Sequence, residues 1–375
     1  MHPQGLASVS TPFCAVPALA TLIRRAIARD GGWLGFDRFM ALALYAPGLG
    51  YYARSDRQFG LLARDGSDFV TAPELSPLFG RALARQVRQA IHGGAGREVW
   101  EFGGGSGALA LQLLDALGNT VGCYTIVELS APLRAIQRER LQQHAAKLRW
   151  VDGLPDRIDG VVLGNEVLDA MPVQLLHFDG ATWYERGVAL HNEAFFFADR
   201  PTTQRPPTSE PVTGAYSTEI HPQVQAFIAT LADRLVHGAA FFIDYGFPQA
   251  EYYHPQRNGG TLMCHRAHRA DADPLADVGE KDITAHVDFT GLALAAQGAG
   301  LDVLGYTSQA RFLMNCGLLD DLEHADLPTR ANAQKLLTEH EMGELFKVIG
   351  FARGLDPAFM QAPIGFSSGD RTHTL

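Results

Sequence analysis

The sequence predicts an α/β fold in which a parallel sheet is covered by helices on both faces. The 375 residues are 46% hydrophobic and 19% charged, which is enough to bury a large core. Short apolar runs alternate with amphipathic helical segments from residue 98 onward, as in sheets of parallel strands. A glycine-rich stretch, EFGGGSG at 101–107, joins the first apolar run to the helical segment behind it.

The first 95 residues are predicted as a helical and loop-rich region. We expect a first helix over about 16–29, ended by the Asp-Gly-Gly at 30–32. The stretch DFVTAPELSPLFGRALARQVRQAI, at 68–91, predicts an amphipathic helix behind a start that contains prolines. We expect this region to form a lid beside a core that occupies residues 96–375.

Strands and helices then alternate along the core. The expected strands are EVWEF from 98, CYTIVELS from 123, LRWVDGL from 148 and IDGVVLGNEVL from 158, and the helices between them are at 108–117 and 131–148. Insertions are expected at about 173–218, with short strands and a Pro/Thr loop at 199–214, and at about 248–285. The remaining expected elements are helices at 221–238, 288–300 and 331–346, and strands at 239–247, 301–307 and 347–354.

Charge and composition exclude several classes of protein. The net charge of −10 argues against a nucleic-acid partner, because such proteins usually display a basic face to phosphates. No run of 18 apolar residues and no signal core is present, so we expect neither membrane insertion nor secretion. The scattered cysteines Cys14, Cys123, Cys264 and Cys316 form no CxxC pair, which fits a reducing compartment. We therefore expect a cytoplasmic location; an organelle presequence, suggested by an acid-free, Arg-containing N-terminus, is the weaker alternative.

The glycine stretch fits two ligand-binding patterns. Gly103, Gly105 and Ala108 match G-x-G-x-x-A of dinucleotide-binding loops, and Gly103, Gly105 and Gly107 after Glu101 match the loop that binds S-adenosylmethionine. In either case the glycines allow a tight turn and a close approach of backbone to ligand at a helix N-terminus. The spacing alone leaves both ligands open.

Acidic residues near the strand ends favour S-adenosylmethionine. Glu101, just before the glycines, could hold an α-ammonium group, which NAD lacks. Glu128 ends the next strand, where a carboxylate accepts both hydroxyls of a ribose in either class of protein. Asp152 follows the third strand and could accept the adenine amino group, although a solvated loop acid is an equal alternative. Thr71, in FVTAPE, is a further candidate for the cofactor site, as part of the lid with Tyr51 and Tyr52; core packing is the rival role.

The fourth strand leads into GNEVLDAMPV at 164–173. If the chain turns helically after Asn165, Glu166 and Asp169 project to one side. Two such carboxylates would suit a cationic acceptor, holding a guanidinium by paired hydrogen bonds and taking up a proton. The alternative is an ordinary helix start, capped by Asn165, with acids in its first turn.

Other residues allow less definite predictions. His286 precedes an expected helix start at Asp288 and is either a base or a first-turn contact. CHRAH at 264–268 with His286 matches no common zinc spacing, so we expect no metal. The Asn/Asp-Pro-Pro-Tyr/Phe loop of base-modifying amino methyltransferases is absent after the fourth strand, which favours a protein side chain or a small amine as acceptor.

These motifs together resemble the MidA-type S-adenosylmethionine-dependent methyltransferases. The resemblance covers nearly the whole chain. The set of motifs in this order is more specific than any single motif. The matching stretches are FMALALYAPGLGYY, FGLLARDGSDFVTAPELSPLFG, EFGGGSGALA, GNEVLDAMPV, FFIDYGFPQAEYYHPQRNGGTLMCHRAHRADADPL, DITAHVDFT and EMGELFKVIG. Many relatives carry alanine or proline where this chain has Gly104.

The resemblance implies a class I, Rossmann-like methyltransferase with a mostly parallel seven-stranded sheet, an N-terminal helical region and insertions on the acceptor side. It implies cofactor contacts from Gly103, Gly105, Gly107 and Glu128, with GNEVLDAMPV facing the acceptor. We also expect Asn165, within that stretch, to contact the cofactor. Mitochondrial members of the family methylate protein arginine in a subunit of respiratory complex I, so the implied partner is a protein, with a respiratory-complex subunit as the candidate. A small-molecule N- or O-methyltransferase, and a non-catalytic assembly factor that keeps the cofactor site, remain the alternatives.

Overall fold

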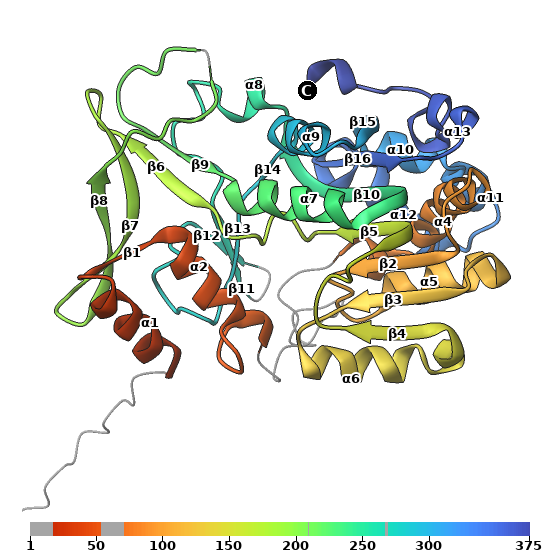
Figure 1. Ribbon diagram of the computed structural model, residues 1–375, viewed down its shortest axis with the longest axis horizontal. Helices are drawn as coiled ribbons and strands as arrows, with labels where there is room; N and C mark the ends of the chain where they lie inside the picture. The colour runs from red at the N-terminus through yellow and green to blue at the C-terminus, as the bar shows by residue number, and fades with distance from the viewer. Residues whose placement is uncertain (1–17, 54–70, 209, 267–268) are drawn as a thin grey trace, which may run out of the picture.

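The centre of the computed structural model, which describes residues 18–53, 71–208, 210–266 and 269–375, is a seven-stranded sheet (Figure 1). Its strand order is β15-β16-β10-β5-β2-β3-β4, and the short β14 adds to the end of β10. The five strands from β10 to β4 are parallel, whereas β16 is antiparallel to both of its neighbours. The bounds are β2 Glu98–Phe102, β3 Cys123–Val127, β4 Leu148–Val151, β5 Ile158–Asn165, β10 Leu235–Phe247, β14 Val287–Asp288, β15 Asp302–Ser308 and β16 Phe346–Arg353. The predicted α/β class is confirmed.

Helices cover both faces of this sheet. Val161 and Leu163 of β5 pack in one apolar cluster with α4, α5, α10 and α12, and Val162 between them packs in a second cluster with α7 and α9. Successive side chains of a strand point to opposite faces, which explains why this strand is apolar throughout. The bounds are α4 Pro77–His92, α5 Ala108–Leu117, α7 Pro222–Arg234, α9 Phe289–Gly298, α10 Gln309–Asn315 and α12 Leu327–Leu337.

A second, antiparallel sheet lies on the side of the molecule toward which the parallel strands point (Figure 1). It has the order β1-β7-β6-β9, with β8 added to β7. The helices α1 and α2 and the strand β13 pack on it in a third apolar cluster. The bounds are α1 Ala18–Arg29, β1 Trp33–Gly35, α2 Phe36–Tyr45, β6 Gln174–Phe178, β7 Trp183–His191, β8 Ala194–Pro201 and β9 Tyr216–Ile220, with a small sheet of β11 Met263–Arg266, β12 Arg269–Asp271 and β13 Asp282–Thr284.

The first predicted insertion and the N-terminal residues therefore share one structural layer. The strand β1 pairs with β7, with Leu34 opposite Val188. The boundary at residue 95 between a lid region and a core stays a prediction.

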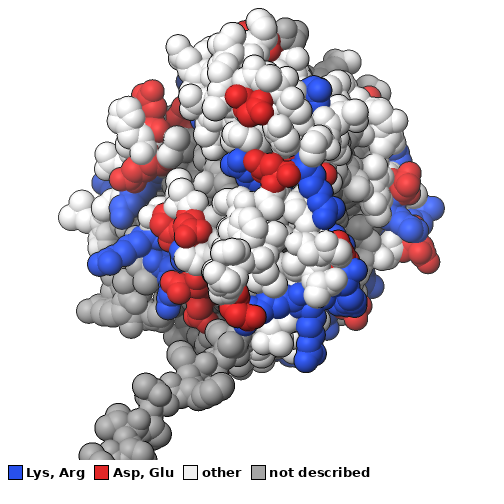
Figure 2. Space-filling view, turned by 90° about the vertical axis from the view of Figure 1, so that its left-hand side faces the viewer, with Lys and Arg blue, Asp and Glu red and all other residues white. Residues whose placement is uncertain are grey.

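The outer face of this layer carries basic and acidic side chains side by side (Figure 2). Within this layer Arg186 pairs with Asp199 at 2.8 Å, and Arg24 with Glu193 at 3.2 Å.

Local sequence signals set several helix starts. Ser76 caps α4 by accepting a hydrogen bond from the Leu78 N–H at 3.3 Å, and Pro77 occupies the first turn, where it needs no N–H partner. Ser130 caps α6, Ala131–Arg140, by accepting from the Leu133 N–H at 3.4 Å. The remaining helices are α3 Ala72–Leu75, α8 Gln249–Tyr252, α11 Leu318–Glu323 and α13 Pro357–Gln361, with shorter turns at Tyr51–Ala53, Gly118–Thr120, Gln142–Lys147, Glu339–Gly343, Ile364–Phe366 and Thr372–Thr374.

The structure corrects some predicted boundaries. The helix expected over 221–238 ends at Arg234, because Leu235 already pairs with Ile158 in the parallel sheet. The strands β1, β8 and β9 of the antiparallel sheet and the short strands β11 to β14 were not predicted. The strand β8 includes the first residues of the expected Pro/Thr loop. In the part of the chain that the structure describes, no helix has the length and apolarity to cross a bilayer.

Candidate functional site

The glycine loop lies between β2 and α5, at the carboxyl end of the parallel strands. Gly103, Gly105 and Gly107 have φ values of 62°, 51° and 83°, a left-handed conformation that side chains with a Cβ rarely adopt. A Cβ added at Gly105 would meet no atom closer than 3.9 Å, so this part of the loop borders open space. The structure therefore brings the predicted glycines together as a backbone cradle in front of the N-terminus of α5.

Glu101 lies beneath this cradle at the end of β2. Its side chain is 3% exposed, and its Oε2 accepts a hydrogen bond from the Tyr124 hydroxyl at 2.8 Å. Burial raises the pKa of Glu101 to about 7, and the charge of Glu128 adds to this effect, while the Tyr124 hydrogen bond opposes it. A cation placed next to this carboxyl would favour its ionised form.

Glu128 follows β3 and is tied to the glycine loop by a residue that the sequence did not single out. Gln137, on α6, donates from Nε2 to the Gly105 carbonyl at 2.9 Å and to Glu128 Oε2 at 3.3 Å. Its Oε1 accepts from Trp150 Nε1 at 2.9 Å. The Ser130 N–H donates to the other oxygen of Glu128 at 2.8 Å. Burial raises the pKa of Glu128 despite these hydrogen bonds.

Asp152 lies at the same edge of the sheet. It directly follows β4, where the Glu128 N–H donates to the Val151 carbonyl at 3.0 Å, and its side chain is exposed. Leu129, next to Glu128, is 73% exposed. Two carboxylates and one apolar side chain thus border the end of β3 and β4.

Residues before α4 also reach the glycine loop. Glu74 of α3 accepts hydrogen bonds from the Ser106 hydroxyl and from Arg140 Nη1, the latter at 2.7 Å. Thr71 precedes α3 and is half-buried, and the next residue, Ala72, donates its N–H to the Glu166 carboxyl. Residues 54–70, which join Tyr51 and Tyr52 of the predicted lid to Thr71, lie outside the described residues.

After β5 the chain forms a turn in place of the expected helix. Glu166 has a φ of 54° and its N–H donates to the Ile243 carbonyl at 2.9 Å, which breaks the helical path. Asn165 does not cap a helix; its Nδ2 donates to Glu166 Oε1 at 3.0 Å. This excludes the helix start offered as the alternative role for these residues. It also removes the helical geometry from which Glu166 and Asp169 were expected to project to one side.

The turn is held by an acid at the end of β10 that the sequence did not identify as part of the site. One oxygen of the fully buried Asp244 accepts the N–H groups of Val167, Leu168 and Asp169 at 3.1, 2.9 and 3.3 Å. The Tyr245 hydroxyl donates to Asp169 Oδ2. No signal in the sequence pairs residues so far apart, although both acids follow apolar strands.

The two acids of the turn are electrostatically unusual. Burial, together with the charge of Asp169, raises the pKa of Glu166 to about 8. Burial also raises the pKa of Asp169 to about 6, against the hydrogen bond from Tyr245. Within the described residues, Asp169 Oδ1 and Asn165 Oδ1 are buried oxygens without a hydrogen-bond partner. Buried acceptors of this kind are costly unless a donor satisfies them, so they favour a donor-rich ligand.

His286 lies behind the turn. Its ring stacks on Phe247 with centroids 5.2 Å apart and meets Tyr245 edge-on at 5.0 Å. Burial lowers its pKa to about 4, with a further contribution from the charge of Arg257, so the ring is neutral at physiological pH. Asp288 caps α9 as expected, accepting from the Gly291 N–H at 3.0 Å.

The CHRAH stretch offers no ligand set among the described residues, in which no group of three or more His, Cys, Asp or Glu is placed to hold a metal ion. Cys264 is buried on β11 beside His265, and His268 lies outside the described residues.

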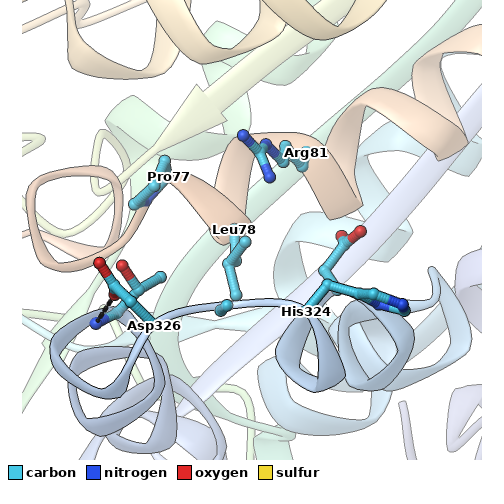
Figure 3. Close-up of a pocket in the computed structure, with 8 residues that line it drawn as sticks. Pro77, Leu78, Arg81, His324 and Asp326 are labelled. Carbon is cyan, nitrogen blue, oxygen red and sulfur yellow. Dashed lines mark hydrogen bonds between the residues drawn. The ribbon is translucent and has the colours of Figure 1, made fainter.

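A separate cavity of about 310 Å³ lies between the first turns of α4 and the helices α11 and α12 (Figure 3). Arg81 and His324 extend from opposite walls, and Asp326 caps α12 by accepting from the Thr329 N–H at 2.8 Å. We call the turn from Asn165 to Asp169 the acid turn. No residue of the acid turn or of the glycine loop lines this cavity.

Comparisons with known proteins identify the type of site. Residues 78–307 match a family model described as "Putative S-adenosyl-L-methionine-dependent methyltransferase". The crystal structure of a Burkholderia thailandensis protein bound to S-adenosyl-homocysteine is 51% identical, covers 96% of each chain and superposes with a TM-score of 0.91. The match to a cofactor-bound structure resolves the choice between NAD and S-adenosylmethionine in favour of the latter, and confirms the class I fold.

More distant relatives are curated enzymes. "Protein arginine methyltransferase NDUFAF7, mitochondrial" of Danio rerio is 26% identical over 76% of this chain and 74% of its own length. The Caenorhabditis elegans homologue is 25% identical over 92% of this chain and 89% of its own length. Both relatives are named as mitochondrial, which contradicts the predicted cytoplasmic location.

Proposed function

Because this chain belongs to the family of S-adenosylmethionine-dependent methyltransferases, we propose that it methylates an arginine side chain of a protein, in the turn after β5. The observation that carries this proposal is the pair of unpartnered buried oxygens, Asp169 Oδ1 and Asn165 Oδ1, beside the ionisable Glu166. The names of the curated relatives support an arginine acceptor. We further propose a respiratory-complex subunit as the protein substrate, as the resemblance to the MidA-type enzymes implies.

The residues around the glycine loop fit the cofactor. The open cradle at Gly105, in front of the positive end of the α5 dipole, suits the carboxylate of its methionine part, and the buried Glu101 suits the α-ammonium. Glu128, held by Gln137 and Ser130, would accept the ribose hydroxyls. Asp152 and the exposed Leu129, at the same sheet edge, would contact the edge and the face of the adenine. Thr71 and Asn165 complete the proposed cofactor contacts.

The acid turn fits a cation with several N–H donors. The free Oδ1 of Asp169 and the Oδ1 of Asn165 can only accept hydrogen bonds, and a guanidinium presents five N–H donors and no acceptor. A hydrogen bond between two charged groups is stronger than a neutral one, especially away from water. Glu166 and Asp169 would thus orient the acceptor nitrogen while Asp244 holds the turn rigid.

When bound, the cofactor supplies an activated methyl group on a sulfonium, and the transfer is an in-line displacement. The chain's own residues position the acceptor and exclude water. The methylated guanidinium remains a cation, so one proton is released per transfer, and Glu166 and Asp169 are the nearest proposed acceptors for it. His286, neutral and with its Nδ1 unpartnered, is the remaining candidate for this proton.

Mass spectrometry of peptide methylation tests the proposal. The purified protein is incubated with S-adenosylmethionine and a pool of peptides digested from a cell extract, and modified residues are then located. The proposal predicts methyl groups on arginine. Methylation of lysine, carboxylate or metabolites alone would replace the arginine assignment with another acceptor.

A further inference from the structure

Tyr45, the last residue of α2, is brought to the acid turn from the N-terminal layer of the molecule. Its hydroxyl donates to the carbonyl of Ala170, next to Asp169, at 2.9 Å. Its ring stacks on Tyr52 with centroids 5.6 Å apart and an angle of 19° between the planes. The side chain is nevertheless 39% exposed, which is high for a tyrosine whose hydroxyl and one ring face are both engaged. The rest of the ring is therefore free to contact a ligand.

Carboxylates surround this aromatic pair. The Tyr52 hydroxyl lies 2.8 and 2.9 Å from the two oxygens of the buried Asp282. Burial and the charges of Asp282, Asp169 and Glu128 all raise the pKa of Tyr45, so its hydroxyl stays protonated and keeps its hydrogen bond to Ala170. Tyr45 is held next to Asp169 through the Ala170 carbonyl, and its stacking partner Tyr52 lies against Asp282.

We propose that the exposed face of Tyr45 stacks on the guanidinium of the acceptor arginine and thereby determines the specificity of the site for a planar cation. This inference rests on the proposed arginine methylation. The quadrupole of an aromatic ring attracts a cation placed over its face, and a planar guanidinium also stacks on the ring. Asp169 Oδ1 would then accept an N–H at the edge of the same group, which the stacking leaves free.

Two contacts hold the Tyr45 ring in place. The Ala170 carbonyl accepts the hydrogen bond of its hydroxyl next to Asp169, and Tyr52 stacks on one face of the ring. Tyr52 is itself in edge-on contact with Tyr51, with centroids 5.0 Å apart. A ring fixed in this way loses little conformational freedom on binding. A compact ammonium is also attracted to the ring face, but it lacks the planar surface that stacks on the ring, so the ring favours arginine over lysine.

The test measures binding of two small probes by calorimetry, with the full chain saturated with S-adenosyl-homocysteine. Nα-acetyl-arginine amide carries the guanidinium, and Nα-acetyl-citrulline amide is its neutral counterpart. The variants are Tyr45→Phe, which keeps the ring, and Tyr45→Leu, which keeps an apolar side chain without it. Tyr184→Leu, on β7 of the antiparallel sheet, is the matched control. S-adenosyl-homocysteine affinity and thermal unfolding are measured for each variant to establish that it folds.

The inference predicts that wild type, Tyr184→Leu and Tyr45→Phe bind the arginine probe more tightly than citrulline, and that Tyr45→Leu loses about fivefold or more in arginine affinity. The citrulline affinity should change little in any variant. If wild type prefers arginine and Tyr45→Leu binds it equally well, the role of Tyr45 is overturned while the arginine proposal stands. If wild type shows no preference for arginine over citrulline, the arginine proposal itself fails, and this inference with it. If Tyr45→Leu does not bind S-adenosyl-homocysteine, Tyr45→Phe decides the question, because it keeps the ring and removes only the hydroxyl. A fivefold loss of arginine affinity in Tyr45→Phe would assign the effect to the hydroxyl and contradict a role for the ring.

Discussion

The Tyr245 hydroxyl donates a hydrogen bond to Oδ2 of Asp169, while Oδ1 of the same buried carboxylate has no partner. The carboxylate is thus fixed through Oδ2, whereas Oδ1 is buried without a side-chain donor. Tyr245 immediately follows Asp244, which binds the backbone of the turn, so the end of β10 positions both the turn and its acid. This relationship underlies the proposed acceptor site and the predictions that depend on it.

Neutralising either acid of the turn should impair methylation without weakening cofactor binding. We expect Asp169→Asn and Glu166→Gln each to lower kcat/KM for an arginine peptide by about tenfold to a hundredfold, since each removes a charge-assisted hydrogen bond to the acceptor. The dissociation constant for S-adenosyl-homocysteine should stay near that of wild type. Asp156→Asn, a change at a fully exposed acid, is the control. Wild-type turnover in both site variants would rule out the acceptor role of the turn.

Methylation should increase with pH through the range in which these acids ionise. The pKa of Asp169 is raised to about 6 and that of Glu166 to about 8, so both are increasingly protonated as the pH falls below 8. Because a protonated acid cannot pair with a guanidinium, kcat/KM should rise from pH 6 and level off only about one pH unit above the pKa of Glu166. Glu166→Gln should remove the upper part of this rise. A flat profile in wild type would contradict the need for ionised acids.

The same burial should make Glu166 a cost to stability at high pH. A carboxyl whose pKa is higher in the folded state than in the unfolded state favours folding less as the pH rises from about 4.5 to about 8. Glu166→Gln should therefore unfold at the same temperature as wild type near pH 4.5 and at a higher temperature near pH 9, without cofactor. Glu139→Gln, at an exposed helical position, should show no such difference. Equal unfolding temperatures of Glu166→Gln and wild type at pH 9 would show that folding does not raise the pKa of Glu166.

Gln137 should matter for cofactor affinity. Its Nε2 joins the Gly105 carbonyl to Glu128, so Gln137→Leu leaves both acceptors without this donor. We expect the dissociation constant for S-adenosyl-homocysteine to rise by about tenfold, as for loss of a hydrogen bond to a charged group. Gln142→Leu, exposed and just beyond the same helix, should bind normally. Unchanged affinity in the Gln137 variant would mean that the loop and Glu128 hold their positions without it.

Much of the parallel sheet could be predicted from the sequence because its signals are local. Apolar runs such as 158–165 are buried on both faces, and Ser76-Pro77 marks a helix start within two residues. The glycine loop and Glu128 were predictable because each directly follows a strand. The positive φ of Glu166 was not, since it results from a hydrogen bond to Ile243 on a neighbouring strand.

Contacts between segments far apart in the chain were the part that could not be predicted. Gln137 looks like any polar residue of an amphipathic helix, and Tyr45 like the end of another. Their roles depend on which strands lie next to each other and on how the N-terminal layer packs beside the acid turn. The hydrophobic pattern and the residue spacing of the sequence indicate neither the order of the strands nor the packing of this layer.

The most direct test of the account is a comparison of arginine and lysine peptides as methyl acceptors, in single-turnover reactions of wild type and Asp169→Asn followed by mass spectrometry. The account predicts that wild type adds a methyl group to the arginine peptide and not to the lysine peptide. It also predicts that Asp169→Asn, saturated with S-adenosylmethionine, transfers the methyl group far more slowly. Equal transfer to lysine, or full activity of Asp169→Asn, would contradict an acceptor site built to hold a guanidinium in the turn after β5.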